Sequence, residues 1–248
     1  MPELKLSSID TRAPKKYGKE KTKEDFQKLK FELEELQNLL YAEGKHALLV
    51  VIQGMDASGK DGVVKNVFDA VNPLGCIVHS FKAPEAEEMK HDFLWRIHQR
   101  VPAKGMIHVF NRSYYEDVII QRVHKWVDEK TIKLRFNQIN DFESLLKETG
   151  TTVLKFYLHV SMEEQLERLN ERMQDKTKMW KYNANDIKER DYWKDYMQAY
   201  EDAFQQCSKH SEWHVVPSDQ NWYKEYVIAN IIVDTLKGFN MKYPGMKP

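Results

Sequence analysis

The sequence predicts an α/β fold in which about five parallel strands form one sheet, with helices on both of its faces. Apolar runs alternate along the chain with stretches of helical periodicity, and this alternation is typical of parallel strands joined by right-handed crossovers. The first apolar run leads into a glycine-framed loop that ends in Lys60, and a helical pattern follows it. The sequence has no internal repeat and no low-complexity linker. A single folded domain is therefore the simplest division of the chain.

The predicted strands and helices are placed by apolar patterns and by local stop signals. Continuous apolar runs are typical of buried strands, and they occur at 47–53, 76–81, 106–110, 152–160 and 213–218. Helical periodicity covers 23–43, 63–71, 84–99, 114–148, 186–206 and 222–237. Gly44 and Gly150 are natural helix stops, and Ser161 with Glu164 resembles a capping box that begins a further helix. Residues 1–22 are polar and basic, and they are predicted to form an arm that is either disordered or docked elsewhere on the protein.

The composition argues against several classes of protein. The 38 basic and 38 acidic residues balance, so no global field steers the chain toward nucleic acid or membrane, and neither is an expected partner. Cys76 and Cys207 are the only cysteines, which fits a reducing compartment rather than a disulfide framework. Residues 1–20 contain no apolar signal core, and no run reaches membrane-spanning length. These features predict a soluble, cytoplasmic protein.

The loop at 54–62, GMDASGKDG, matches the phosphate-binding pattern G-x-x-x-x-G-K at Gly54, Gly59 and Lys60. Free backbone N–H groups and the dipole of the following helix attract anions at such a turn, where Lys60 has no obvious packing role. The predicted phosphate-binding residues of the loop are Gly54, Ser58, Gly59 and Gly62. We therefore interpret the turn as a phosphate cradle, and a glycine-rich turn that binds nothing is the alternative.

Two carboxylates in the same loop are the candidate metal ligands. Asp61 occupies the position where Ser or Thr usually follows the lysine to bind magnesium, and Asp56 lies inside the loop. Magnesium is usually held by one or two carboxylates together with phosphates and water, and the third strand ends in Asn111 rather than in an aspartate. The alternative role for Asp56 and Asp61 is N-capping and compensation of the helix dipole.

Polar side chains also follow the second and third predicted strands. Lys82 follows the second strand, and Asn111, Arg112 and Glu116 follow the third. Ligands of an open parallel sheet gather beyond the carboxyl ends of its strands. The planar fork of Arg112 can grip a phosphate with two parallel hydrogen bonds, and a structural ion pair with Glu116 or Asp117 is the alternative.

The segment 168–190 carries seven basic residues and four acidic ones. It follows the fourth strand, at the place where mobile lids close over phosphates in nucleotide kinases and exclude water. We therefore predict a cationic lid, although a charge run can also be no more than a solvated helix face. The number of cations exceeds what one triphosphate needs, which indicates a longer polyanion as the ligand. The predicted phosphate-binding residues of the lid are Arg168, Arg172, Lys176, Lys178, Lys181 and Arg190.

Four stretches of the sequence resemble one known family. They are GMDASGKDG (54–62), HDFLWR (91–96), FNRSYYEDV (110–118) and MWKYNANDIKERDYWKDYMQAYED (179–202). Over roughly residues 23–240 the chain is similar to the family 2 polyphosphate kinases. The resemblance implies a P-loop nucleotide-kinase-like (thymidylate-kinase-like) fold, which is a three-layer sandwich with a helical lid. It divides the chain into the arm at 1–22 and a kinase-like domain at 23–248, with its lid at about 168–190.

The resemblance also implies an activity and assigns roles to residues. Members of the family transfer a terminal phosphoryl group between inorganic polyphosphate and nucleotides, reversibly and with magnesium, and manganese is a candidate substitute. By this resemblance Asp56 and Asp61 organise metal and phosphates. Lys60 grips the transferring group, Arg112 contacts phosphate, and the lid cations line a polyphosphate channel. The residues implied in nucleotide binding are Lys82, Trp95, Arg96, Asn111 and Glu116.

The residues after the third strand imply a subclass of acceptor. The type directed at nucleoside diphosphates typically reads DRSWYN there, and this chain departs from that form at Asn111 and Glu116. The chain looks more like the subclass that accepts nucleoside monophosphates as well as diphosphates. We therefore expect AMP and ADP as acceptors, with guanine nucleotides as further candidates. A homodimer or homotetramer is the expected assembly. The aromatic-rich helix 187–204 and the helix 222–237 are candidate interfaces, and packing in the core is the alternative for both.

Two other functions remain open on the sequence alone. An ATP-dependent nucleoside or nucleotide kinase would place ATP over the same loop, and a nucleotide-sensing or polyphosphate-binding protein would hold a ligand without turnover. Formation of ATP from ADP and polyphosphate, with no ATP added, separates the first alternative from the leading hypothesis. The binding protein would lose affinity on Lys60→Ala and would show no turnover at all.

Overall fold

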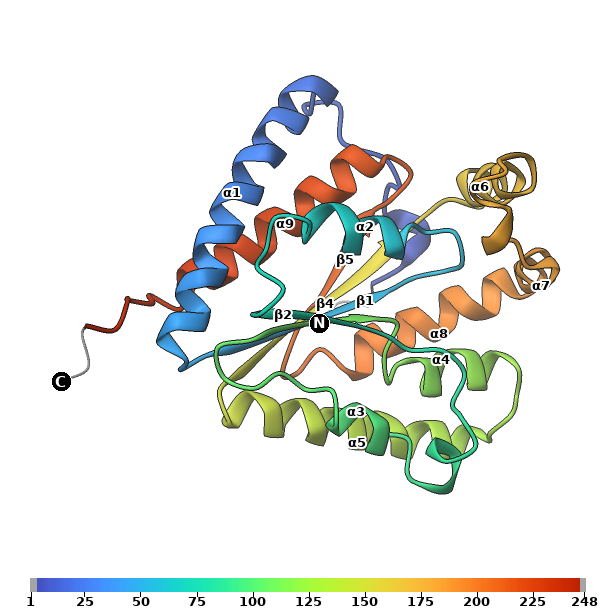
Figure 1. Ribbon diagram of the computed structural model, residues 1–248. Helices are drawn as coiled ribbons and strands as arrows, with labels where there is room; N and C mark the ends of the chain where they lie inside the picture. Colours follow the sequence, from blue (N-terminus) through green and yellow to red (C-terminus); the bar gives the residue numbers. More distant parts are fainter. Residues whose placement is uncertain (1–3, 246–248) are drawn as a thin grey trace.

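Five parallel strands form the sheet of the computed structural model, which describes residues 4–245 (Figure 1). The strands are β1 (Ala47–Gln53), β2 (Cys76–Ser80), β3 (Ile107–Asn111), β4 (Thr151–His159) and β5 (Trp213–Pro217). They lie in the order β2-β3-β1-β4-β5, and every neighbouring pair is parallel. Each predicted strand agrees with the observed one to within a residue at either end. The agreement is good because central parallel strands need continuous apolar runs.

Helices connect the strands and begin or end at the predicted capping residues. The α-helices are α1 (Lys19–Glu43), α2 (Lys60–Val67), α3 (Trp95–His98), α4 (Glu116–Val123), α5 (Glu129–Glu148), α6 (Met162–Gln174), α7 (Ala184–Lys188), α8 (Trp193–Gln206) and α9 (Asn221–Gly238). Short 3₁₀ helices lie at Leu6–Ser8, Glu88–Lys90, Met179–Lys181 and Glu189–Tyr192. Gly44 ends α1 in the left-handed conformation, and Ser161 caps α6 by accepting a hydrogen bond from Glu164 N. These local signals therefore fix the ends of the two helices that they flank.

The sheet is the middle layer of a three-layer sandwich (Figure 1). β1 is buried along its whole length, and its side chains alternate between the two outer layers. Leu48, Val50 and Ile52 pack in one core with side chains of α1, α2 and α9. Leu49 and Val51 pack in the opposite core with side chains of α4, α5 and α8. The predicted α/β sandwich is confirmed, and the carboxyl ends of its strands lie beside the lid helices α6 and α7 (Figure 1).

Four predicted helices are shorter than expected or interrupted. The helix expected over 63–71 begins earlier, at Lys60, and already ends at Val67. The helix expected over 84–99 is wrong, because most of the segment is irregular and only a 3₁₀ turn and the short α3 form. Its residues up to Asp92 are exposed apart from Glu88, so they offer no apolar stripe to pack. The helix expected over 114–148 is divided near Lys125, which has a φ of 55°. The helix expected over 186–206 is interrupted by the 3₁₀ turn Glu189–Tyr192.

The N-terminal arm lies against the body of the protein within its described part, residues 4–18. Leu6 is buried, and its backbone N–H donates to the carboxylate of Glu201 on α8. Of the two predicted alternatives, docking is the one observed. α1 begins at Lys19, so its first turn belongs to the segment that was predicted as arm. No helix in the range 4–245 combines the length and the apolar character that crossing a membrane requires.

Candidate functional site

The loop between β1 and α2 has the backbone that a phosphate cradle requires. Gly54, Ala57 and Gly59 have positive φ angles of 153°, 59° and 97°. A Cβ at Gly54 would lie 2.8 Å from Ser58 Oγ, and a Cβ at Gly59 would lie 2.2 Å from Lys224 Nζ. Glycine is therefore required at both positions, by backbone conformation and by lack of space. The loop ends at the amino terminus of α2, where the helix dipole favours an anion.

Lys60 is buried at the base of this loop. Its Nζ donates hydrogen bonds to Gly54 O (2.7 Å) and to Met55 O (3.0 Å). Burial, followed by the charge of Arg112, lowers the pKa of Lys60 to about 8, and nearby carboxylates oppose the shift. Phosphate oxygens would be stronger acceptors for this ammonium group than two backbone carbonyls. Lys60 is thus a cation held in place for an anionic ligand.

Arg112 joins two carboxylates at the end of β3. It has a left-handed backbone, with φ of 64°, and donates to Asp56 Oδ1 (2.6 Å) and to Glu116 Oε2 (3.1 Å). Burial would raise the pKa of Asp56, but Arg112 and Lys60 outweigh it and hold the pKa below its usual value. The ion pair with Glu116 is therefore present, and Asp56 is a second partner that the sequence pattern does not indicate. A strained non-glycine backbone that carries a cation into a cleft is typical of a functional site.

Asp61 links the phosphate loop to the lid. Its Oδ1 accepts from Asn111 Nδ2 (2.9 Å), and its Oδ2 accepts from Lys181 Nζ (2.6 Å). Burial would raise the pKa of Asp61, but the hydrogen bonds from Lys181 and Asn111 outweigh it and lower the pKa. The N-cap of α2 is Gly59, and no side chain caps this helix. The N-capping alternative for Asp56 and Asp61 is therefore wrong, whereas Asp61 lies in the first turn of α2, where its charge can still compensate the helix dipole.

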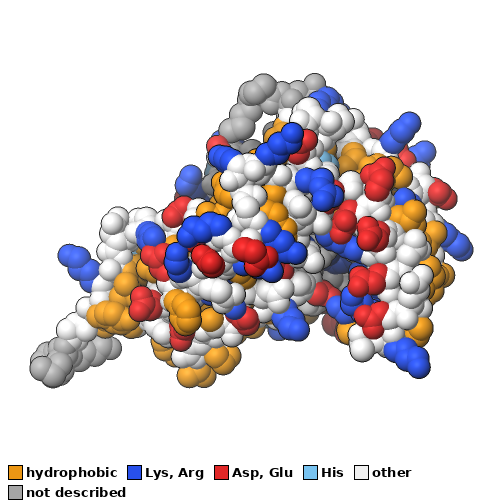
Figure 2. Space-filling model, turned by 90° about the horizontal axis from the view of Figure 1, so that it is seen from above, with side chains coloured by type: hydrophobic (Ala, Val, Ile, Leu, Met, Phe, Trp, Pro, Cys, Tyr) orange, Lys and Arg blue, Asp and Glu red, His pale blue; other side chains and the backbone are white. Residues whose placement is uncertain are grey.

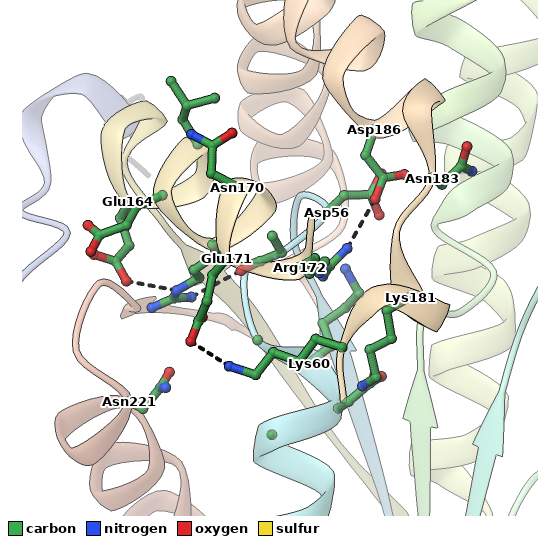
Figure 3. Close-up of a pocket in the computed structure, with 18 of the residues that line it drawn as sticks. Asp56, Lys60, Glu164, Asn170, Glu171, Arg172, Lys181, Asn183, Asp186 and Asn221 are labelled. Carbon is green, nitrogen blue, oxygen red and sulfur yellow. Dashed lines mark hydrogen bonds and ion pairs between the residues drawn. The ribbon is translucent and has the colours of Figure 1, made fainter. Parts of the chain in front are cut away.

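Arg168 on α6 is tied directly to the phosphate loop. Its guanidinium donates to Ala57 O and to Ser58 O, both at 3.1 Å, and to Ser218 O at 2.7 Å. Its Nε also pairs with Glu164 at 2.8 Å (Figure 3). Since the loop, α6 and the end of β5 all meet at this one side chain, Arg168 fixes the base of the lid against the loop.

The lid cations that line the cleft beyond Arg168 are each paired with a carboxylate. Figure 3 shows Arg172 and Asp186 pointing toward one another beside Asp56, in the gap between α6 and α7. These pairs are partly exposed, and exposed ion pairs contribute little stability, so a polyanion can replace the carboxylates. The pairs are Arg172–Asp186, Lys178–Glu171 and Lys181–Asp61.

An open cleft of about 1520 Å³ lies between the phosphate loop, the end of β3 and the lid (Figure 3). It brings together all of the predicted catalytic and metal-binding residues and most of the other predicted ones. The predicted residues that line it are Asp56, Gly59, Lys60, Asp61, Gly62, Lys82, Asn111, Arg112, Arg168, Arg172, Lys178 and Lys181.

The other predicted residues do not line this cleft. They are Gly54, Ser58, Trp95, Arg96, Glu116, Lys176 and Arg190. Ser58 is buried within the loop, and Glu116 reaches the cleft through Arg112. Arg96 is buried and donates to Lys82 O (2.9 Å), so it supports the segment that carries Lys82. The Trp95 ring instead stacks on an imidazole, that of His91.

Two predicted lid cations have different surroundings from the rest. Lys176 is exposed and forms no ion pair within residues 4–245. Arg190 donates to Gln165 Oε1 (2.8 Å), and Gln165 Nε2 donates in turn to Asp56 O (3.0 Å). Arg190 is therefore placed to support the loop through Gln165, and Lys176 points to solvent.

Lys224 on α9 is a cation of the site that sequence reasoning missed. Its Nζ donates to Ser58 O (3.1 Å) and to Asn221 Oδ1 (2.8 Å), directly behind the phosphate loop. Burial, followed by the charge of Arg168, lowers the pKa of Lys224 to about 7. One signal was available in the sequence: Lys224 stands one helical turn before Ile228, on the buried stripe of a helix that is otherwise apolar there.

Comparison with known proteins identifies the family to which this site belongs. The family model for polyphosphate kinase 2 matches residues 16–244. The AMP/ADP-polyphosphate phosphotransferase of Meiothermus ruber is 45% identical, over 98% of this chain and 91% of its own length. The ADP-polyphosphate phosphotransferase of Rhodopseudomonas palustris is 42% identical, over 87% of this chain and 79% of its own.

A solved structure agrees with this match over the whole fold. The crystal structure of polyphosphate kinase 2 from Arthrobacter aurescens has a TM-score of 0.96 to this protein at 42% sequence identity. The similarity covers 100% of this chain and 90% of the other. The chain belongs to the polyphosphate kinase 2 family.

Proposed function

We propose that this protein transfers a phosphoryl group between inorganic polyphosphate and the nucleotides AMP and ADP, in both directions. The observation that carries the proposal is the cleft in which the phosphate loop faces the lid cations Arg172, Lys178 and Lys181. This arrangement suits a donor with many phosphates better than one triphosphate. The names of the Meiothermus ruber and Rhodopseudomonas palustris relatives support the same donor and acceptors.

The residues around the loop supply positioning and charge. The transition state of phosphoryl transfer is loose and spreads charge over the phosphoryl oxygens, so no covalent nucleophile is needed. Lys60 exchanges the carbonyls of Gly54 and Met55 for oxygens of the transferring group. Arg112 turns its fork from Asp56 and Glu116 toward phosphate. Once they have changed partners, both cations stabilise the charge that develops on the transferring group in the transition state.

The lid cations bind the phosphates of the donor that lie beyond the transferring group. When the chain enters, its oxygens replace Asp186, Glu171 and Asp61 as partners of the lid cations. Repulsion moves Asp186 and Glu171 away from the phosphates, whereas Asp61 is freed to hold a divalent cation, and the lid closes on the donor. Closure excludes water, which would otherwise compete with the nucleotide for the phosphoryl group.

The acceptor is placed at the end of β2 and β3. Lys82 and Asn111 line this side of the cleft, and Glu116 lies behind Arg112. We assign the phosphates of AMP or ADP to Lys82 and Arg112, and the discrimination of acceptor length to Asn111 and Glu116. Guanine nucleotides are further candidate acceptors, because Lys82 and Arg112 would recognise the phosphates of the acceptor and not its base.

The donor set of the loop fits a divalent cation. Within residues 4–245 no three His, Cys, Asp or Glu side chains gather to hold a metal on their own. Asp56 Oδ2 accepts no hydrogen bond from the described part of the protein, so it is open to a cation. Asp61 belongs to the same loop and directly follows Lys60 in the sequence. One or two carboxylates completed by phosphate oxygens and water are the usual set for Mg²⁺, which we propose, with Mn²⁺ as a substitute. An ion held by Asp56 and Asp61 would supply positive charge that offsets the negative charge of the phosphates.

The test is a coupled assay with purified protein. ADP and polyphosphate are supplied without ATP, and ATP formation is followed by luciferase luminescence. AMP replaces ADP in a second reaction, whose ADP product is resolved by ion-exchange chromatography, and GDP replaces ADP in a third. Product in the ADP and AMP reactions is expected. Product that forms only when ATP is supplied as donor would instead support an ATP-dependent kinase.

We also propose that the enzyme assembles as a homodimer or homotetramer in the cytoplasm. The edge strand β2 leaves Ile77 and Val78 about two-fifths exposed, and Leu74 beside them is exposed as well. Cys76 and Cys207 are free thiols, which fits a reducing compartment. Light scattering after size-exclusion chromatography gives the mass of the assembly, and a monomer would contradict the proposal.

A further inference from the structure

The N-terminal arm is fastened to the protein at the edge of the functional cleft. Thr11 Oγ1 donates to Asp219 Oδ2 (2.7 Å), and Asp219 N donates back to Thr11 O (2.9 Å). Ala13 N donates to Gln220 Oε1 (2.8 Å), and the ring of Tyr17 packs on that of Tyr223 at 4.9 Å. Because backbone hydrogen bonds hold Thr11 and Ala13 and a ring contact holds Tyr17, residues 11–17 have a defined position.

The fastened segment and the first residue of α1 carry four exposed cations, and the acidic residues nearest to them in sequence are Asp10 and Glu20. Residues 12–19, RAPKKYGK, contain no Asp or Glu. All four basic side chains are exposed, and none forms an ion pair with any residue in 4–245. Figure 2 shows a face of the protein on which acidic and basic side chains are intermingled. We call this set the arm cations: Arg12, Lys15, Lys16 and Lys19.

The arm cations lack carboxylate partners, whereas the lid cations of the cleft have them. Arg172, Lys178 and Lys181 are all neutralised by carboxylates in this structure. The arm cations have no carboxylate to give up, and the one ring contact among them is that of Lys16 Nζ with Tyr17 at 5.3 Å, so they stay available for an anion that reaches them. A segment that keeps four unpaired positive charges near one another, on a chain with no net charge, has the character of an anion-binding surface.

A continuous surface leads from the functional cleft to the arm cations. Asn221 lines the functional cleft, and the residue before it, Gln220, holds Ala13 of the arm. Asn221 and Gln220 also line a second hollow of about 1030 Å³, whose wall includes Lys19 of the arm cations. Acidic side chains lie along this hollow too, among them Glu20, which pairs with Lys23. The path from the cleft therefore runs along the side of the hollow where the arm is fastened.

We propose that the arm cations form a subsite for the distal phosphates of a long polyphosphate chain. The inference rests on the proposed function, because it takes the reacting end of the same chain to lie at Lys60. A chain that fills the cleft and is longer than the cleft passes Asn221 and meets the arm cations next. The subsite selects for chain length, since short chains never reach it, and it retains a long chain between successive transfers.

A single-stranded nucleic acid is the competing polyanion, and the surface favours polyphosphate over it. Proteins that bind single strands combine cations with exposed aromatic rings on which bases stack. The aromatic residue of the segment, Tyr17, is half-buried against Tyr223 and is not free to stack. Because the path begins at the phosphate loop, its natural ligand is the polyanion that this loop receives.

The test compares two sets of substitutions that remove the same charge. In the first, the arm cations are replaced as R12Q, K15Q, K16Q and K19Q together. In the matched control, four exposed and unpaired lysines elsewhere on the protein are replaced as K130Q, K133Q, K147Q and K209Q. Both sets lower the net charge equally, and neither touches the cleft. KM is measured for long-chain polyphosphate. For tripolyphosphate, KM is measured if it acts as a donor, and the inhibition constant is measured if it acts as a competitive inhibitor.

We expect the arm variant to raise KM for long-chain polyphosphate roughly ten-fold at low salt, while kcat and the constant for tripolyphosphate stay unchanged. The slope of log KM against log salt should fall by about 0.7 for every arm cation that contacts phosphate. The control should leave both quantities near their original values.

Three outcomes would overturn the subsite. One is an equal change in KM for long and short chains, and another is an equal change in the arm variant and the control. The third is loss of binding to a single-stranded DNA oligonucleotide with no change in KM for long-chain polyphosphate, which would assign the surface to nucleic acid. Absence of turnover in the unsubstituted protein would instead count against the proposed function itself.

Discussion

The phosphate loop and the lid bring cations to the same cleft, but they hold them differently. Lys60 is buried beneath the loop and bonded to two backbone carbonyls. Arg172 and Lys178 in the lid are partly exposed and paired with carboxylate side chains. A buried cation without a charged partner is costly, and its lowered pKa reflects that cost, whereas an exposed ion pair dissociates easily. The difference indicates a fixed anion site in the loop and an exchangeable one in the lid.

The largest effect is expected on removal of the fixed cation. Lys60→Met keeps the length of the side chain but removes its charge, so the transferring group loses its main protein cation. We expect kcat for ATP formation from ADP and polyphosphate to fall by about 10³-fold. Stability should change little, because relief from burying an ammonium group offsets the two lost hydrogen bonds. Steady-state kinetics and thermal unfolding of the same preparation check both statements, and a variant that keeps a tenth of the activity would contradict them.

The next largest effect tests whether the site needs the planar guanidinium group of Arg112 or only its positive charge. Arg112 reaches Asp56 and Glu116 with two separate nitrogens of its planar fork, whereas a lysine offers a single point charge without that fork. We therefore expect Arg112→Lys to lower kcat by roughly 10²-fold. Arg122→Lys is the matched control, because Arg122 also joins two carboxylates, Glu129 and Asp202, but lies outside the cleft.

The two arginine variants are compared in the same assay at saturating polyphosphate. Arg122→Lys should retain nearly full activity, since a partly exposed ion pair contributes little. Equal losses in both variants would mean that Arg112 acts only by holding the structure together.

The sequence predicts those parts of the fold and of the site that depend only on residues close together in the chain. The strand ends and the glycines of the loop follow from apolar runs and from a fixed motif, and the structure places them as expected. The helix expected over 84–99 failed for the converse reason. Pro84 is a start signal, but the residues after it have no apolar stripe and therefore no surface against which a helix could be stabilised.

The parts that the sequence does not predict depend on contacts between distant segments. The pairing of Arg112 with Asp56 exists because β1 and β3 are neighbours in the sheet, so the loops that follow them meet. Lys224 reaches Ser58 only because α9 packs behind the loop. Lys176 and Lys178 are equivalent by composition, yet only Lys178 lines the cleft. Composition therefore locates a cationic lid, and the fold decides which of its cations face the ligand.

A smaller effect tests this geometric selection within the lid. Arg172→Gln removes a cation that lines the cleft, and Lys176→Gln removes one that does not. Loss of a charge-assisted hydrogen bond should raise KM for polyphosphate roughly ten-fold in Arg172→Gln. Lys176→Gln should behave like the unsubstituted enzyme when both are assayed over a series of polyphosphate concentrations. Similar KM changes in the two variants would favour a diffuse electrostatic field over defined contacts.

The smallest expected effect is the uptake of protons by the buried lysines when a polyanion binds. The pKa is lowered to about 8 for Lys60 and to about 7 for Lys224, so both side chains are partly neutral near pH 8. A bound polyanion favours the charged forms and raises both pKa values, so binding takes up protons, between about one and two in all at this pH. Affinity should accordingly fall as the pH rises through 7 and 8, whereas near pH 6 both groups are already charged and uptake disappears.

Titration calorimetry in two buffers of different ionisation enthalpy measures the number of protons taken up. Protons released by the phosphates themselves are common to all variants, so the quantity of interest is the difference from Lys224→Met. That variant should take up fewer protons than the unsubstituted protein near pH 8, by roughly the neutral fraction of Lys224. No difference between the two would mean that the ammonium group of Lys224 does not sense the ligand, and the fixed anion site would then consist of the loop, Lys60 and Arg112 without α9.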